Sequence, residues 1–461
     1  MNSLNIRKDK MFMTILSLAW PTMLEQLMQT AVQYVDTAMV GSLGTQATAA
    51  VGSTSTVNWL VGSTVSAVGI GFLSYISRAL GEKDHQKARA ATAQSVFVVL
   101  IGGIFLTLLT AFLSGYIPEW MSVEEGTRKL ASHYFAILYS PMLFRTATII
   151  FGTVLRAAGD TKTPMKVGIA VNAVNILLNF FLIYPVRSAD VLNFRMTIPG
   201  AGLGIYGAAL ASAVAFAVGG ICITVALWAH PDISPRGSSF LPDLKILRPC
   251  FAVAIPNALQ RFGTSFGYVV FASMINSVGD AATAAHTIAN TVESAFYIPA
   301  YGMQTAAATL AGNAFGERNG ERLKTLGKTI LRIEVLLMVI SGGLLFLLAP
   351  WMVRLFSEQA QVIMLGTVVL RMVALSEPFY GISIIVEGML QGMGRTVFPF
   401  VVNLIGMWLV RIIGTFICTQ IFGVGLIAAW ACMIAHNLLM AMLYGVFYLS
   451  GKWNPLLSKK S

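Results

Sequence analysis

The chain has 461 residues, of which 56% are hydrophobic and only 11% are charged, whereas an ordinary soluble domain has about 25% charged residues. This composition excludes a soluble globular protein and indicates a protein that crosses a lipid bilayer many times. The net charge of +11 is spread over short polar segments and not gathered in one patch, so we do not expect nucleic acid as a partner.

Twelve apolar segments, separated by polar breaks, are each long enough to cross the bilayer, which takes about 20 helical residues. The first follows a polar, basic start and is too long for a cleavable signal peptide, so we expect it to remain as a helix. The predicted fold class is therefore an all-α polytopic membrane protein with twelve transmembrane helices. Their approximate spans are 13–40, 48–78, 88–115, 127–156, 164–185, 203–229, 246–277, 283–314, 325–350, 360–391, 398–420 and 424–449.

Lysine and arginine are distributed unevenly between the two sides that these helices define. The termini and the loops after even-numbered helices hold 22 of the 31, including Arg7, Lys8 and Lys10, whereas the loops after odd-numbered helices hold five. Cytoplasmic loops carry the excess of positive charge. We therefore expect a multi-pass protein of the cell inner (plasma) membrane with both termini cytoplasmic.

An internal repeat divides the chain into halves. A shift of 235 residues lays Pro21 on Pro256 and Gly44 on Gly279, and it still holds in the fourth and tenth helices. Each half has six crossings, so both enter the membrane in the same direction, as two pseudo-symmetric lobes with a solute cleft expected between them. The predicted units are an N-terminal six-helix lobe, a Pro- and Ser-rich cytoplasmic linker and a C-terminal six-helix lobe, at 1–230, 231–243 and 244–461.

Ionisable residues within the predicted helices are candidates for function, because a charge at the centre of the bilayer costs about 3 kcal/mol or more. Arginine stays protonated and cannot relay a proton by titrating, so we expect the arginines to be structural partners and the acids to act. Asp36 and Glu293 stand out because their repeat mates, Phe271 and Asn58, are uncharged. The full set is Glu25, Asp36, Arg145, Arg261, Glu293, Glu387 and Arg411.

The fifth predicted helix offers amide side chains that could face Asp36. Asn172, Asn175 and Asn179 are three and four residues apart and therefore lie on one face of the helix. A carboxylate among amides can be held in polar surroundings as a proton site. The alternative is that the amides only cross-link helices.

Motifs of small residues and turns recur at matching places in the two halves. The first half has PTMLEQLMQTAVQYVDTAMVGSLG, LRAAGDTKTP, NILLNFFLIY and GIYGAALAS, and the second has INSVGDAATAAHTIANTVES, TLAGNAFGERN and LQGMGRTVFP. In this order they resemble the multidrug and toxic compound extrusion (MATE) family over nearly the whole chain. The resemblance implies a secondary active exporter that works by alternating access and takes bulky organic cations.

The resemblance also implies a cation-coupling site, built from an acid on helix 1, Asn and Asp on helix 5 and Thr on helix 6. These positions are here Asp36, Asn175, Asn179 and Ser212. Because Asn179 replaces the second acid, a bound sodium ion would keep little charge compensation. Protons are therefore the expected coupling ion, sodium is the alternative, and no cofactor is expected.

The predicted substrate contacts are polar and aromatic residues on helices that could border the cleft. Aromatic faces attract organic cations, although such residues serve helix packing more often than binding. We place Glu293 near the middle of the membrane, where it would meet the positive charge of the substrate. The predicted contacts are Glu293, Gln33, Tyr34, Asn58, Tyr268, Tyr297, Tyr380 and Glu387.

Other functions and pairings are considered alongside these predictions. A flippase for lipid-linked carriers is the alternative function, and it would be expected to have a basic cleft for pyrophosphate. An enzyme is not expected, because the chain has no HExxH motif, no aspartate-rich diphosphate motif and no Cys/His constellation. We expect a monomer in the lipid bilayer that carries small amphipathic or cationic substrates. A smaller hypothesis pairs Arg261 with Glu25; the alternative is two separate charges that snorkel to the interface.

Overall fold

The structure is a computed structural model that describes residues 11–121, 123–191 and 194–458. The residues Arg7, Lys8 and Lys10, which support the predicted cytoplasmic termini, lie outside this part of the chain. The elements in chain order are α1 (Met11–Gly41), α2 (Thr45–Gly81), α3 (His85–Leu113), α4 (Ile117–Trp120), α5 (Glu125–Tyr139), α6 (Met142–Ala157), α7 (Lys162–Leu182), β1 (Pro185–Val191), β2 (Phe194–Ala201), α8 (Ile205–Ala229), α9 (Leu244–Asn276), α10 (Asp280–Gly316), α11 (Gly320–Arg354), α12 (Ala360–Ala374), α13 (Glu377–Gly392), α14 (Val397–Ile405), the π-helical η2 (Gly406–Ile412), α15 (Ile413–Phe416), the π-helical η3 (Ile417–Ile421), α16 (Leu426–Leu449) and α17 (Pro455–Ser458).

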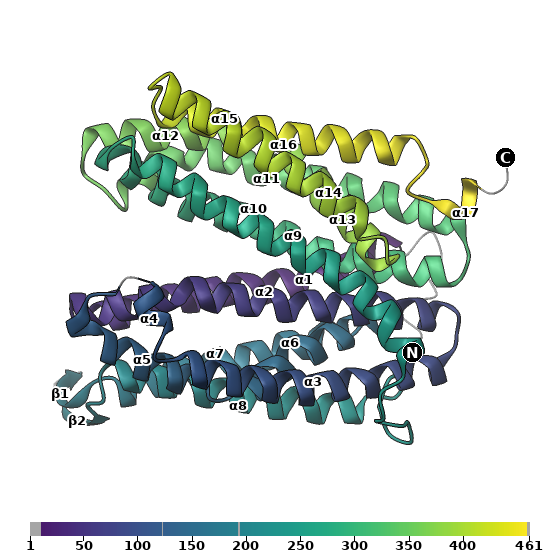
Figure 1. The fold of residues 1–461 in the computed structure, drawn as a ribbon, viewed down its shortest axis with the longest axis horizontal. Helices are drawn as coiled ribbons and strands as arrows, with labels where there is room; N and C mark the ends of the chain where they lie inside the picture. Colours follow the sequence, from purple (N-terminus) through teal and green to yellow (C-terminus); the bar gives the residue numbers. More distant parts are fainter. Residues whose placement is uncertain (1–10, 122, 192–193, 459–461) are drawn as a thin grey trace.

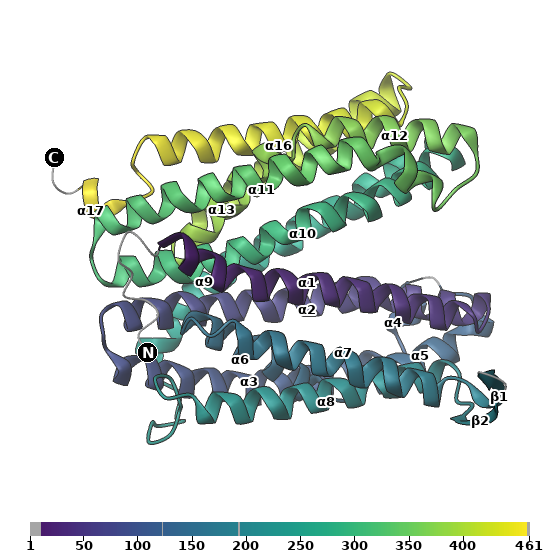
Figure 2. The ribbon, with the colours of Figure 1, turned by 180° about the vertical axis from the view of Figure 1, so that it is seen from behind.

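Two helical lobes lie side by side, and Figures 1 and 2 show the same arrangement from opposite sides. The first lobe contains α1 to α8 and the second contains α9 to α17. The lobes meet near the end where α17 lies and diverge toward the opposite end, where the antiparallel hairpin β1–β2 extends from the first lobe. The sequence analysis did not predict this hairpin, which occupies the loop after the fifth predicted helix.

The helices follow the predicted spans closely. When α5–α6, α12–α13 and α14 to η3 are each counted as one segment, the described chain has twelve long helical segments. The two bent pairs are repeat mates: α5 ends at Tyr139 and α12 at Ala374, 235 residues later, and the bends are 50° and 52°. The predicted fold class, twelve helices in two pseudo-symmetric lobes, is confirmed.

The helices differ in how apolar they are. By length and hydropathy, seven described helices could cross a membrane, or nine if each bent pair is one span. The remaining long helices, α1, α9 and α10, are more polar and lie at the boundary between the lobes. On the outer faces, large apolar side chains are exposed, as on α3 at Leu100, Ile101, Phe105, Leu108 and Phe112. Such faces suit contact with lipid tails.

Glycines let the lobes approach closely at the end where they meet. A Cβ on Gly81 would overlap the carbonyl oxygen of Asn313, and a Cβ on Gly316 would overlap that of Arg78. Both pairs are related by the 235-residue repeat, so one contact is the pseudo-symmetric copy of the other. Ser74 Oγ adds a hydrogen bond of 3.0 Å to the carbonyl of Gly392. Small residues at helix contacts are what close packing within a membrane requires.

The segment 230–243 joins the lobes and contains turns but no helix or strand. It lies against the start of α3, where Arg89 Nη2 donates to the carbonyl of Pro231 at 2.7 Å. The side chain of Gln94 donates to the carbonyl of Leu241 at 2.8 Å and accepts from the backbone N–H of Asp243 at 2.9 Å. The connection is therefore anchored to the first lobe.

Candidate functional site

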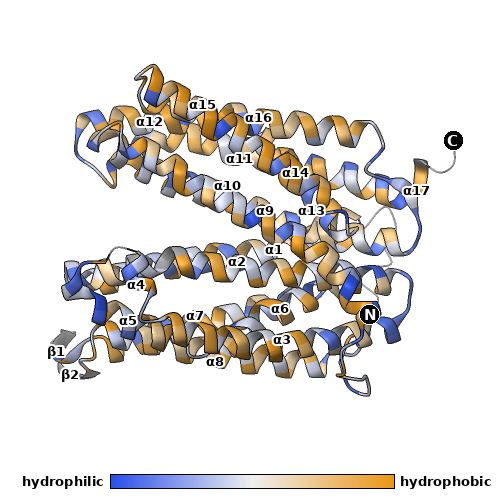
Figure 3. Ribbon diagram, in the orientation of Figure 1, coloured by the Kyte–Doolittle hydropathy of each residue, from blue (hydrophilic) through white to orange (hydrophobic). Residues whose placement is uncertain are grey.

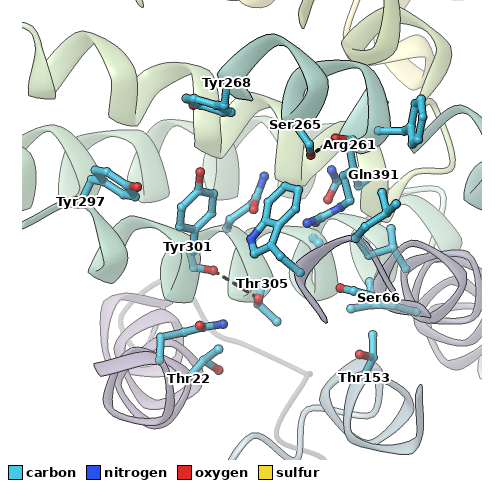
Figure 4. Close-up of a pocket in the computed structure, with 18 of the residues that line it drawn as sticks. Thr22, Ser66, Thr153, Arg261, Ser265, Tyr268, Tyr297, Tyr301, Thr305 and Gln391 are labelled. Carbon is cyan, nitrogen blue, oxygen red and sulfur yellow. Dashed lines mark hydrogen bonds between the residues drawn. The ribbon is translucent and has the colours of Figure 1, made fainter. Parts of the chain in front are cut away.

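A cavity of about 850 Å³ lies between the lobes, lined by α1, α2 and α6 on one side and by α9, α10 and α13 on the other. Figure 4 shows Tyr268, Tyr297 and Tyr301 from the second lobe opposite Thr22 and Thr153 from the first. The wall combines aromatic rings with hydroxyl and amide groups. Its volume falls in the range of sites that enclose a drug-sized molecule.

The charged residues among the described lining are Arg156 and Arg261. Arg156 Nη2 donates to both carboxylate oxygens of Glu25, at 2.7 and 2.6 Å. Arg261 instead donates from Nε to Asn257 Oδ1 at 2.9 Å. The predicted pair of Glu25 with Arg261 is therefore wrong: Glu25 is neutralised within its own lobe. Arg156 was missed because it is the last residue of the fourth predicted span and was not counted among the ionisable residues within the helices.

Glu387 lies beside this wall and is held by neutral amides. Its Oε1 accepts from Gln260 Nε2 and from Gln391 Nε2, each at 2.9 Å, and its Oε2 accepts from Asn403 Nδ2 at 3.1 Å. Gln260 and Gln391 are the repeat mates of Glu25 and Arg156. The first lobe thus has an ion pair where the second has two amides that hold a separate carboxylate.

The four residues of the predicted coupling site lie together in the first lobe. Asn179 Nδ2 donates to Asp36 Oδ1 at 2.7 Å. In the orientation that satisfies its amide, Asn175 donates from Nδ2 to Asp36 Oδ1 at 2.8 Å and accepts from Ser212 Oγ at 3.0 Å. Asn172 lies on the same helix but outside this cluster, and its Nδ2 has no hydrogen-bond partner among the described residues.

Asp36 has amide donors but no counter-charge among the described residues. No basic side chain of the described chain forms a salt bridge with it. Its side chain is half-buried, and Gln33, which lies less than one helical turn away, lines the cavity. A partly exposed, uncompensated carboxylate near the cavity is suited to bind and release a cation from water.

Glu293 lies in the second lobe, where it is not the repeat equivalent of Asp36. It lies on α10 between Asn290 and Tyr297, which both line the cavity and share its helix face by their spacing. Its side chain is nonetheless buried and within electrostatic range of Arg411. The Arg411 guanidinium lies over the rings of Tyr268 and Phe271, with its Cζ 4.6 and 4.2 Å from the two ring centroids.

The predicted substrate contacts separate into two groups. Gln33, Tyr268 and Tyr297 line the cavity. Tyr380 lies behind the wall, where its hydroxyl bonds to that of Tyr301 at 3.0 Å. Asn58 accepts a hydrogen bond of 3.3 Å from the hydroxyl of Tyr139. The predicted residues outside the described lining are Tyr34, Asn58, Glu293, Tyr380 and Glu387.

Two buried acids were missed by the sequence analysis. Glu334 in α11 and Glu377 at the start of α13 have exposed fractions of 0% and 1%. Neither carboxylate oxygen of either residue has a hydrogen-bond partner among the described residues. For Glu334 the available signal was an isolated acid in the long apolar run LRIEVLLMV, which the sequence analysis counted only as part of the ninth span.

Comparisons with known proteins agree on one family. The family model MatE matches residues 21–181 and 256–417. The chain is 29% identical over 448 residues to the probable multidrug resistance protein NorM of Thermotoga maritima, covering 97% of this chain and 93% of that protein. It is 27% identical over 395 residues to the probable multidrug resistance protein YpnP of Bacillus subtilis, covering 85% of this chain and 84% of that protein. An outward-facing structure of a multidrug resistance MATE family transporter has the same fold, with a TM-score of 0.87 and 23% identity. The match covers 98% of this chain and 97% of that transporter.

Proposed function

This chain belongs to the MATE family of efflux transporters, and we propose that it exports small amphipathic or cationic solutes in exchange for protons. The observation that carries the choice of ion is the site at Asp36. One carboxylate accepts from the amides of Asn179 and Asn175. No basic side chain of the described chain pairs with it.

This site favours a proton over sodium on grounds of charge. A proton neutralises Asp36 fully, and the neutral acid can still hydrogen bond with the amides around it. A sodium ion would be a hard cation with one carboxylate and a few neutral oxygens, whereas such ions are usually held by several oxygen ligands. Sodium therefore remains the alternative coupling ion.

The shape of the molecule supports transport by alternating access. The lobes touch at one end through Gly81 and Gly316, and they diverge at the other, with the cavity between them. We infer that the contact end faces the cytoplasm, together with both termini, in the inner membrane. A monomer suffices to form the transport cavity, because both of its walls come from one chain.

Recognition of cationic substrates would come from the second lobe. Tyr268, Tyr297 and Tyr301 present aromatic faces to the cavity, and such faces attract organic cations. Glu293 lies on the same face of α10 and supplies negative charge near this wall. Its burial means that it would act on the substrate through the field rather than by direct contact.

A flippase for lipid-linked pyrophosphate carriers is less well supported. The cavity wall has two arginines, but Glu25 neutralises Arg156. Arg261 is in turn within electrostatic range of Glu387. The wall therefore lacks a cluster of free positive charge that would bind a pyrophosphate.

The test is flux of an organic cation such as ethidium into proteoliposomes. With the ion moving down its gradient and the solute moving the opposite way, a pH gradient should drive ethidium toward the acidic side. A sodium gradient at constant pH should drive none. The reverse result would assign the protein to sodium coupling, and no gradient-driven flux of several cationic and neutral probes would overturn the proposal.

A further inference from the structure

Glu334 and Glu377 lie close together inside the second lobe. Glu377 is the first residue of α13, at the 52° bend that follows α12. Glu334 reaches the same helix from α11, since a Cβ at Gly381 would lie 3.1 Å from Glu334 Oε1. Gly381 is about one turn along α13 from Glu377, and the two carboxyl groups are within electrostatic range of each other. Broken helices at membrane depth are where transporters place solute and ion sites.

These carboxyl groups lack the partners that a buried charge needs. Their four oxygens have no hydrogen-bond partner among the described residues, and no described basic group forms a salt bridge with them. An unpaired carboxylate is strongly destabilised in such surroundings and binds a proton instead. Two adjacent carboxyl groups also resist ionising together. The pair therefore holds at least one proton.

Tyrosine side chains lie near these acids, and Tyr297, which lines the cavity, is within electrostatic range of Glu377. Tyr301 also lines the cavity, and its hydroxyl bonds to that of Tyr380 at 3.0 Å. Tyr380 lies less than one turn after Glu377 on α13, and its ring packs edge-on against Tyr297 at 5.9 Å between centroids. Among the described titratable and charged groups, Tyr297 and Glu293 from α10 are within electrostatic range of Glu377, and Arg411 is within range of Glu293.

We propose that Glu334 and Glu377 form a second proton-binding site, in the C-terminal lobe, that exchanges a proton with the cavity past the three tyrosines. In the loaded form both carboxyl groups are neutral. Release of one proton to water leaves a single negative charge on the pair, with the remaining proton shared between the two groups. That charge lies behind the aromatic wall and attracts an organic cation in the cavity, so binding of a cation favours release of the proton.

This site rests on the proposed proton exchange but is independent of Asp36, and counting released protons separates the two. Purified protein in weakly buffered detergent solution is mixed with tetraphenylphosphonium, and a pH indicator reports the protons released per bound cation. We expect two from the wild type, one from Asp36→Asn, one from the double variant Glu334→Gln/Glu377→Gln, and none when all three are replaced. Glu358→Gln, an exposed acid of the same lobe, should match the wild type.

Each outcome decides between the two sites. Release from the double variant that equals the wild type would overturn the inference and leave the role of Asp36 intact. Loss in the double variant with full release from Asp36→Asn would support the inference and overturn the coupling role of Asp36.

A second measurement needs neither a variant nor a transported cation. Dicyclohexylcarbodiimide reacts with protonated carboxyl groups in apolar surroundings, and mass spectrometry locates the adduct. Glu334 or Glu377 should be labelled more strongly at mildly acidic pH, where both carboxyl groups are neutral, than at alkaline pH, where one proton has been released. Absence of label on both residues, or labelling that does not change with pH, would overturn the inference.

Discussion

Asn179 of α7 donates a hydrogen bond of 2.7 Å to Asp36 of α1, and this contact joins the two helices at the carboxylate of the proposed coupling site. The first prediction concerns that carboxylate. Asp36→Asn preserves the shape and removes the titratable group, so gradient-driven export should fall to background while the protein still inserts and folds. Asn172→Ala, on the same helix but outside the cluster, should retain transport. Undiminished export by Asp36→Asn would contradict the proposed coupling role.

The second prediction adds a charge to the same site. Asn179→Asp places a second carboxylate against Asp36, which supplies the charge compensation for a bound sodium ion that a single carboxylate lacks. We expect sodium to raise the melting temperature of this variant in detergent but not that of the wild type. An equal response of both proteins to sodium would show that the missing acid does not determine ion choice.

The third prediction concerns the ion pair of Glu25 with Arg156. Removing one partner of a buried pair costs about 3 kcal/mol, because the other charge is left unpaired. Glu25→Gln and Arg156→Gln should each lower the melting temperature. The double variant, which has the two glutamines found at the repeat-equivalent positions Gln260 and Gln391, should recover much of the loss. Additive losses in the double variant would argue against a mutual stabilisation.

The fourth prediction concerns Glu293. Replacement by Gln keeps the shape and removes negative charge behind the cavity wall, so binding of cationic probes should weaken far more than binding of neutral probes of similar size. Fluorescence titration of purified protein with both kinds of probe measures the difference. Equal losses for both, or loss of expression alone, would assign Glu293 to helix packing.

The fifth prediction concerns the end where the lobes meet. Gly71 lies directly against the carbonyl of Cys250, whose side chain is buried. Gly71→Val should hold the lobes apart there and make the Cys250 thiol reactive toward a maleimide. Gly343→Val is the control, since a Cβ at Gly343 meets nothing within 4 Å. An unreactive Cys250 in Gly71→Val would show that this contact does not hold the lobes together at this end.

The sequence predicted part of the grouping of Asp36, Asn175, Asn179 and Ser212 because that part of the geometry is local. Asn175 and Asn179 are four residues apart, so any helix places them on one face, and the 235-residue repeat fixed the order of helices in both lobes. The pairing of those amides with Asp36 needed the family resemblance, since nothing in the chain itself states that helices 1 and 5 touch.

The apolar segments between polar breaks, together with the 235-residue repeat, predicted twelve helices in two lobes. A backbone in lipid must satisfy its own hydrogen bonds, and long helices do so. Which side of each helix faces inward was decided by the tertiary structure. In a membrane both the lipid-facing and the buried side of a helix are apolar, so apolar periodicity does not fix its rotation. That rotation directs Arg156, and not Arg261, toward Glu25. It also brings Glu334 close to Glu377 inside the second lobe.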